Sequence, residues 1–522
     1  MIYYRNMPSR VFLTILSYVL VSTKCIMKLK FPSAQTILFI IAGLVAIMTW
    51  LVPAGKYDSL SYNSDTEKFE RVTGTQTTEL TADQATLDKL GIKIPLQKFT
   101  SGGIYKPIGI PNTYKEVESN PQGVAAFLQS PIKGIIAAAD IIFLVLIIGG
   151  LIGIMNLTGS FDAGIARLAN ALRGREYLLI ILVTVLVALG GTTFGLAEET
   201  MAFYPILVPV FIAARYDAIV GLASVFLGSA IGTMCSTINP FSAIIASDAS
   251  GINWTTGLVG RATMLGICLI ITIGYIMRYA KRVKNDPTKS IVYDQKEELE
   301  KKFGFDANKE IELTGRHKLM LTVFTLCFVI MIIGVSMLDW WYVEMTTVFL
   351  VGSILIGFLA KLKESDFLAA FAKGAGDLLS VAFIIGIARG VSIIMDDGQI
   401  SDTMLHYASG ITEGMNKGVF ANVMMFVYSG LSFFIPSSSG MAVLTMPVMS
   451  PLADTVDVGR EVVVNCYMYG MGLFYLLNPT GLILASLAVV NIGFEKWLKF
   501  VLPLFVILVL VTMAVLTVSV YV

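Results

Sequence analysis

The sequence predicts an all-α polytopic membrane protein with two inverted-topology repeats, each containing a re-entrant hairpin and a broken transmembrane helix. Of the 522 residues, 55% are hydrophobic and only 14% are charged, and the mean hydropathy is +0.75. This composition is too apolar for an ordinary soluble protein. Two apolar segments are also interrupted by the same dipeptide, at Asn239-Pro240 and Asn478-Pro479. Proline lacks a backbone donor and clashes with the preceding turn, so each helix must break there.

Composition also excludes several classes of function. The net charge is +1, and no basic and aromatic pattern suggests a nucleic-acid partner. The cysteines are scattered singly and only two histidines are present, so neither a disulfide framework nor a metal site is expected. A phosphate-binding loop of the Gly-x-x-x-x-Gly-Lys-Ser/Thr type is absent, which argues against ATP hydrolysis. We therefore expect no cofactor, no bound metal and no catalytic residue. The residues concerned are Cys25, Cys235, Cys268, Cys327, Cys466, His317 and His406.

The first 26 residues are interpreted as an upstream extension from a mis-assigned start codon. Residues 11–23 are apolar and follow two arginines, but they are too few to span a membrane and no clear cleavage site follows. Met27 begins Met-Lys-Leu-Lys, which is typical of a start. The alternative is a real but dispensable leader, and N-terminal sequencing of the expressed protein distinguishes the two.

Local charge divides the chain into four parts. Residues 1–35 form an extension and cytoplasmic lead-in, and 36–280 form the first membrane repeat with an extracytoplasmic loop at 54–130. Residues 281–316 form a cytoplasmic linker, and 317–522 form the second repeat. The linker is placed in the cytoplasm by the positive-inside rule, because basic residues flank it directly: Lys281, Arg282, Lys284, Lys289, Arg316 and Lys318.

The first repeat can be threaded from these fixed ends. A span at 36–52 leaves the cytoplasm and a span at 133–155 returns to it. Short apolar arms at 176–190 and 198–213 then form a re-entrant hairpin, the broken segment 218–247 goes out, and 258–279 comes back. Three arginines after the second span agree with this orientation: Arg167, Arg173 and Arg175.

The second repeat follows two spans, at 319–338 and 344–360. A span at 376–395 leads to a second hairpin at 418–453 with its tip at Pro436–Gly440. The broken segment 460–490 returns inward and the span at 498–521 leaves. Tryptophans near span ends, including Trp497, are expected to form an aromatic belt.

Four landmarks recur in the same order in both halves. They are an Asp-x7-Ile-Gly-x3-Gly pattern, a Pro-x3-Pro pair on each hairpin, the Asn-Pro break, and a closing span. The first begins at Asp140 and again at Asp377, and the second at Pro205 and again at Pro447. Each landmark alone is weak, but four in order indicate an internal repeat. Because matched elements run in opposite directions in the threading, the repeat is inverted.

A site is predicted where the hairpin tips and the helix breaks meet. Broken helices are tolerated in a membrane only where protein buries the freed backbone or where it lines a cavity. Half-helix N-termini favour anions, and free carbonyls can hold a cation. The predicted ligands for substrate or ion are Thr192, Thr193, Glu198, Glu199, Thr200, Ser236, Thr237, Asn239, Ser437, Ser438, Ser439, Asn478 and Thr480.

Charged groups in the membrane segments each have two interpretations. Glu198 and Glu199 could bind a coupling cation, a proton or a cationic substrate, or could merely complement a helix dipole. Arg389 could neutralise a substrate carboxylate or gate access, or could pair with Asp140, Asp377 or a backbone carbonyl. For Asp140 and Asp377 themselves, interfacial snorkelling or capping is the favoured interpretation.

Several motifs resemble the YfcC branch of the four-carbon dicarboxylate anaerobic carrier family. They are Gly-Leu-Ala-Glu-Glu-Thr at 195–200, Cys-Ser-Thr-Ile-Asn-Pro-Phe at 235–241 and Pro-Ser-Ser-Ser-Gly-Met-Ala at 436–442. The likeness extends over nearly the whole chain from about residue 28. It implies a bacterial inner-membrane, multi-pass carrier of the ion transporter superfamily. It also implies a mobile domain that moves like an elevator, and a scaffold that is often dimeric.

The expected function is secondary active transport of a small charged metabolite by alternating access, either basic amino acid exchange or four-carbon dicarboxylate transport. The expected partners are the substrate, the lipid bilayer and, from the resemblance, a second copy of the chain, with Na+ or H+ as coupling ion. The alternatives are an intramembrane enzyme using Glu198 and Glu199 as paired carboxylates, and a passive channel. Polar tips without metal ligands disfavour the enzyme, and the internal pseudo-symmetry disfavours the channel.

Overall fold

The computed structural model describes residues 32–102, 104, 106–172, 174–303, 313–338, 340–411 and 415–521, apart from the side chains of 169, 170 and 336. The predicted extension at 1–26 and the predicted inside charge Arg173 lie outside the described residues. In the described part of the chain, nine helices are long and apolar enough to cross a membrane. The predicted all-α polytopic membrane fold is therefore confirmed for the membrane part of the chain.

The first half begins with α2 (Ala34–Leu51), followed by a folded segment at residues 52–123 that we call the cap. The membrane elements then follow in order: α5 (Val124–Ala137), α6 (Ala139–Leu157), α7 (Ser160–Ala171), α8 (Tyr177–Phe194), η1 (Glu198–Ala202), α9 (Tyr204–Ala213), α10 (Ala218–Met234), η2 (Pro240–Ile244), α11 (Ile245–Ala249) and α12 (Leu258–Asn285). Helix α5 starts before the predicted span at 133–155, so the loop is shorter than expected.

A linker then leads to the second half, whose last eight helices repeat the earlier succession. In both halves two helices joined end to end precede a short helix, a hairpin, a broken helix and a long final helix. The elements are η3 (Pro287–Lys289), η4 (Tyr293–Gln295), α13 (Lys296–Phe303), α14 (Gly315–Met337), α15 (Tyr342–Ala360), α16 (Glu364–Asp377), α17 (Leu379–Asp397), α18 (Ser401–Gly410), α19 (Lys417–Phe434), α20 (Ser438–Thr455), α21 (Arg460–Tyr475), α22 (Ile483–Val490) and α23 (Phe494–Ser519).

The two end-to-end helix pairs cross one another through glycines. Helix α5 packs on α17 and α6 packs on α16. A Cβ added to Gly134 would lie 2.0 Å from the Gly386 carbonyl oxygen, and one added to Gly153 would lie 2.2 Å from the Ala370 oxygen. The beginning of one pair thus meets the end of the other, so these two matched elements run antiparallel. Small residues allow such close backbone contact in membranes. The orientation of the full repeats stays a prediction.

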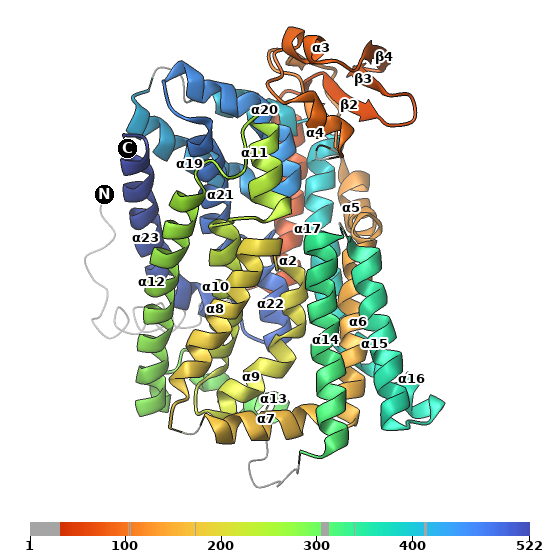
Figure 1. Cartoon of the computed structure of the whole chain (residues 1–522), viewed down its shortest axis with the longest axis vertical. Helices are drawn as coiled ribbons and strands as arrows, with labels where there is room; N and C mark the ends of the chain where they lie inside the picture. Colours follow the sequence, from red (N-terminus) through yellow and green to blue (C-terminus); the bar gives the residue numbers. More distant parts are fainter. Residues whose placement is uncertain are drawn as a thin grey trace, which may run out of the picture. The chain divides into compact units, whose positions relative to one another are not determined.

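The helices form two groups in Figure 1. Helices α6, α14, α15 and α16 lie together on one side, where α6 contacts both α15 and α16. Helices α8, α10, α19 and α21 belong to the other group, in which α8 packs on α10, α19 on α21, and α10 on α21. The two hairpins and the two broken helices are therefore in direct contact with each other.

The outer helix faces carry apolar side chains that are suited to lipid. Ile330 and Ile333 on α14, Leu355 on α15 and Leu510 on α23 are all exposed. Helix α23 is the most apolar span, yet only 28% of its most apolar window is buried inside the protein. Contact with lipid tails removes the cost that such surfaces would have in water. Trp497 departs from the predicted aromatic belt, because it is fully buried and donates its indole N–H to the Leu476 carbonyl.

The cap contains strands that the sequence reading missed, since it expected only a polar loop. Leu60, Phe69 and Ile108 are fully buried in its interior, and this small core orders the segment. The strands pair in the order β4-β3-β2-β5 and β1-β6, all antiparallel. The elements are β1 (Gly55–Lys56), β2 (Ser59–Asn63), β3 (Lys68–Thr73), β4 (Gln76–Thr81), α3 (Gln84–Lys89), α4 (Leu96–Thr100), β5 (Ile108–Gly109) and β6 (Lys115–Glu116).

The cap is attached to membrane elements of both halves, and it lies at one end of the helices (Figure 1). The backbone N–H of Tyr57 donates to Asp402 on α18 at 3.0 Å. Lys98 forms an ion pair with Asp248 on α11 at 2.8 Å, and the Asp248 side chain is only 3% exposed. A buried carboxylate needs such a partner. The cap therefore belongs structurally to the helix bundle.

The linker joins the first half to the last helices. Lys302 on α13 donates to the Val489 carbonyl at 2.9 Å, and Lys496 on α23 pairs with Asp294 at 2.6 Å. The Lys496 ammonium lowers the pKa of Asp294, chiefly through their hydrogen bond. These contacts fix the linker against the end of the second broken helix.

The glycine crossing gives the first testable prediction. Gly134→Leu should destabilise the protein, because any side chain at this position must displace the backbone of α17. We expect its apparent Tm in detergent to fall by about 5 °C or more, the consequence of overpacking by a few kcal/mol. Gly266→Leu on α12 is the matched control, since nothing lies within 4 Å of a Cβ there. Equal melting of both variants would show that the crossing is not a tight contact.

Candidate functional site

The first helix break is organised by the Asn239 side chain. Its Oδ1 accepts the Phe241 backbone N–H at 2.9 Å, and so caps the half-helix that starts with Pro240. Its Nδ2 donates to the Gly191 carbonyl at 3.4 Å and to Ser236 Oγ at 3.1 Å. Gly191 is in the last turn of α8, the first hairpin arm. One side chain, only 1% exposed, thus joins the break to the hairpin tip.

The second break has the same arrangement. Asn478 Oδ1 accepts the Thr480 backbone N–H at 3.0 Å, and Nδ2 donates to the Ser432 carbonyl at 2.9 Å. Ser432 is in the last turn of α19, the first arm of the second hairpin. Asn478 is 2% exposed. An asparagine fits this position because its amide carries both a donor and an acceptor. The acceptor satisfies a backbone N–H after the break, and the donor satisfies a carbonyl at the end of the hairpin arm.

Several predicted hydroxyls serve the backbone around these breaks. Thr192 Oγ1 donates to the Cys235 carbonyl at 2.8 Å and accepts the Thr237 N–H at 3.0 Å. Threonine and serine side chains commonly satisfy freed backbone groups in this way. Thr193, Thr200 and Ser236 donate to carbonyls of their own helix or turn, whereas the Thr237 hydroxyl donates to the Thr192 carbonyl on α8 at 3.2 Å. The predicted site residues that do not line the cavity described next are Thr192, Thr193, Thr200, Ser236, Thr237 and Asn478.

A cavity of about 370 Å³ lies between the two hairpin tips and the two breaks. It is also lined by the α5–α6 joint and by parts of α14, α15 and α17. A cavity of this size suits a small metabolite. The predicted site residues that line it are Glu198, Glu199, Asn239, Ser437, Ser438, Ser439 and Thr480.

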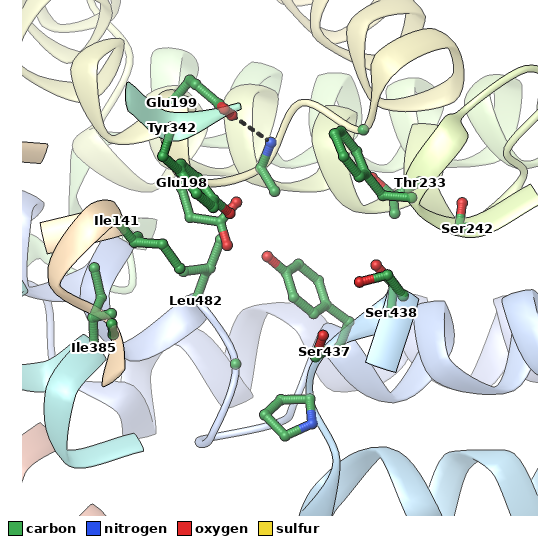
Figure 2. Close-up of a pocket in the computed structure, with 18 of the residues that line it drawn as sticks. Ile141, Glu198, Glu199, Thr233, Ser242, Tyr342, Ile385, Ser437, Ser438 and Leu482 are labelled. Carbon is green, nitrogen blue, oxygen red and sulfur yellow. Dashed lines mark hydrogen bonds between the residues drawn. The ribbon is translucent and has the colours of Figure 1, made fainter. Parts of the chain in front are cut away.

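The first hairpin tip contributes two glutamates with different roles. Helix α8 ends at Gly195, whose φ of +78° is left-handed, as is common after a helix C-terminus. The following turn places the Glu199 carboxylate so that Oε2 accepts the Ala197 backbone N–H at 3.1 Å. Glu198 instead directs its carboxylate toward the space shared with Ser437 and Ser438, as Figure 2 shows. Of the two glutamates, Glu199 thus bonds to the backbone of the tip, whereas the Glu198 carboxylate faces the cavity.

The second hairpin tip contributes hydroxyls and a helix N-terminus. Ser437 Oγ accepts the Gly440 N–H at 3.2 Å and caps α20. Ser438 and Ser439 form the first turn of that helix, where backbone amides lack helical partners and favour anionic groups. The Ser438 carbonyl accepts a hydrogen bond from the Tyr467 hydroxyl at 2.8 Å. The two tips therefore differ in charge, although their positions in the repeat correspond.

Three further charged residues line the cavity, and their positions bear on alternatives raised by the sequence. Asp140 lies at the α5–α6 joint and borders the cavity, and its carboxylate accepts the Ile141 backbone N–H at 2.9 Å. Arg389 also borders it and has no hydrogen-bond or ion-pair partner among the described residues, so the predicted structural pairing is not observed. Lys106 comes from the cap, and the sequence reading did not identify it. Its neighbours in sequence carry no motif that could have done so.

The cavity therefore combines three carboxylates, two cations and several hydroxyls. In the described part of the chain, no group of three His, Cys, Asp or Glu side chains is placed to hold a metal ion. Such a lining can bind a charged metabolite through ion pairs and hydrogen bonds and release it again. The sequence model of the C4-dicarboxylate anaerobic carrier family matches residues 31–521 of the chain.

The chain belongs to the C4-dicarboxylate anaerobic carrier family. Among the relatives of this chain, an uncharacterized protein of Haemophilus influenzae is 44% identical to it over 478 residues, covering 91% of this chain and 94% of that protein. The Escherichia coli protein named "Putative basic amino acid antiporter YfcC" is 28% identical over 492 residues, covering 90% and 92%. The predicted likeness to the YfcC branch of the C4-dicarboxylate anaerobic carrier family is confirmed.

Two solved transporter structures are more distantly similar to this chain. The YdaH transporter of Alcanivorax borkumensis has a TM-score of 0.42 and 12% identity, covering 93% of this chain and 98% of that chain. MtrF of Neisseria gonorrhoeae has a TM-score of 0.41 and 13% identity, covering 98% of both chains. Family membership and the apolar helices together make the chain a multi-pass membrane protein of a carrier family.

The two asparagines at the breaks give the second prediction. Asn478→Asp keeps the acceptor for the Thr480 amide but loses the donor to the Ser432 carbonyl, and Asn239→Asp makes the same change at the first break. We expect each variant to reduce substrate uptake about tenfold or more, because a buried carbonyl loses its partner and gains a repelling charge. Membrane abundance, measured by immunoblot, should stay near wild type.

Asn156→Ala on α6 is the control for both variants, since this asparagine is exposed and its side chain has no hydrogen bond among the described residues. Its uptake should equal that of wild type. Full uptake by both aspartate variants would show that the two helix breaks are not part of the transport site.

Proposed function

We propose that the chain is a secondary active transporter that exchanges basic amino acids across the bacterial inner membrane by alternating access. The observation that carries this proposal is the Glu198 carboxylate, which faces a cavity also bordered by Glu199 and Asp140. Carboxylates at membrane depth are expensive and usually functional. A guanidinium or ammonium group of the substrate would balance them. The name of the Escherichia coli relative agrees with this class of substrate.

A carrier fits the cavity better than the two alternatives do. An enzyme would need acid, base or nucleophile groups positioned on a reacting bond, whereas Ser437 caps α20 and Ser439 accepts a hydrogen bond from Lys106. A passive channel would need a continuous pore, and its re-entrant segments usually meet in a symmetric oligomer. Here two hairpins of one chain meet at two breaks of the same chain. Alternating access would then arise from movement of the hairpins and broken helices against the remaining spans.

Four-carbon dicarboxylates are the second candidate substrates. Lys106, Arg389 and the N-terminus of α20 border the same cavity and would favour a dianion. The family description names this substrate class. In that case Glu198 and Glu199 would be left to bind the coupling cation, Na+ or H+.

Counterflow in proteoliposomes distinguishes the two candidates and supplies the third prediction. Vesicles preloaded with ornithine should accumulate labelled arginine from outside, whereas vesicles preloaded with succinate should not accumulate labelled malate. Protein-free liposomes set the background. Malate exchange without arginine exchange would contradict the proposed substrate class, and release of a chemically altered product would contradict a carrier.

The glutamate pair gives the fourth prediction. Glu198→Gln should reduce arginine counterflow about tenfold or more, because the cavity loses the charge that balances the substrate cation. Glu199→Gln should be milder, since an amide oxygen can still accept the Ala197 N–H. Glutamine has nearly the same size as glutamate, so neither variant should disturb packing. Equal membrane abundance therefore serves as the common control. A larger defect in Glu199→Gln than in Glu198→Gln would contradict the assigned roles.

A further inference from the structure

Lys106 reaches the transport cavity from the cap, outside the membrane helices. Its Nζ donates to Ser439 Oγ, in the first turn of α20, at 3.1 Å. Ser439 is 7% exposed, and both residues border the cavity. The lysine is therefore in contact with the tip of the second hairpin.

The position of Lys106 is fixed by folded structure on its C-terminal side. Strand β5 starts two residues later, and Ile108 pairs with Leu60 of β2 in the cap sheet. The neighbouring Gly109 packs against Tyr57, and a Cβ there would lie 4.0 Å from the Leu444 carbonyl of α20. The cap sheet and the second hairpin thus fix the position of this part of the cap.

Lys106 and Arg389 place two positive charges on one cavity. Burial lowers the pKa of Lys106, and the nearby Arg389 guanidinium lowers it further. Two like charges close together are unfavourable unless an anion lies between or beside them. Arg389 has no hydrogen-bond or ion-pair partner among the described residues, although Asp396, two turns further along α17, interacts with it electrostatically. Its guanidinium is suited to bind a carboxylate in two-point contact.

We infer that Lys106 and Arg389, with Ser439 beside Lys106, form a subsite for the carboxylate of the substrate. This inference rests on the proposed function and extends it. The substrate would then present a cationic group to Glu198 and a carboxylate to Lys106 and Arg389. The cap contributes directly to recognition, and amines that lack the carboxylate are discriminated against.

The test compares arginine with agmatine, which is arginine without its carboxylate. Affinities of purified wild type, Lys106→Met and Arg389→Met are measured by isothermal titration calorimetry. Wild type should bind arginine about tenfold or more tightly than agmatine. In both variants the arginine affinity should fall to near the agmatine value, while the agmatine affinity stays within about twofold of wild type.

Lys68→Met is the matched control, because Lys68 is a cap lysine that pairs with Glu79 on the exposed face of the sheet. It should keep the wild-type preference for arginine. An equal loss of arginine and agmatine affinity in Lys106→Met would indicate that the lysine only supports packing, and this would overturn the subsite. An unchanged preference in both cavity variants would overturn it as well.

Failure of the proposed substrate class gives a different result. If wild type binds neither amine, the same proteins are titrated with succinate and butyrate, which differ by one carboxylate. The subsite then predicts that Lys106→Met and Arg389→Met lose the preference for succinate, and an intact preference overturns it. If wild type binds none of the four compounds, both the substrate class and the subsite are overturned.

Discussion

The structure depends on two buried asparagine side chains that each satisfy the backbone of two elements at once. A helix that breaks inside a membrane leaves amide and carbonyl groups that lipid cannot satisfy. Asn239 and Asn478 each accept a backbone N–H two residues further along the chain, after the break, and donate to a carbonyl in the last turn of a hairpin arm. The same contacts that make the breaks tolerable also fix the hairpin tips beside them. A cavity between the two breaks follows from this arrangement.

The halves use the same backbone frame for different chemistry. The first hairpin tip ends in Glu198 and Glu199, whereas the second ends in Ser437, Ser438 and Ser439 beside the N-terminus of α20. Glycine crossings between the end-to-end helix pairs hold the two halves against each other. Because the cap and α17 add a lysine and an arginine, the cavity has both signs of charge. Such a lining suits a metabolite with groups of both signs.

Much of the membrane part could be predicted from the sequence, because Pro, Gly and long apolar runs act locally. The hairpins, the breaks and the long helices lie close to their expected ranges. Contacts between distant segments could not be predicted. Thr192 and Thr237 have the polarity of site residues, yet their hydroxyls satisfy backbone groups. Lys106 enters the cavity only because the cap folds around Leu60, Phe69 and Ile108, which a reading for membrane spans treats as a loop. Trp497 lies at the start of the last span, but it is buried in the core beside the second break.

The most direct test of this account is an experimental structure of the protein with arginine bound. The account predicts ligand density in the 370 Å³ cavity, in contact with Glu198 of the first hairpin tip and with the first turn of α20 in the second. Density at another place, such as the cavity between α9, the end of α12 and the linker, would contradict it. It would show that the two helix breaks support the fold without forming the transport site.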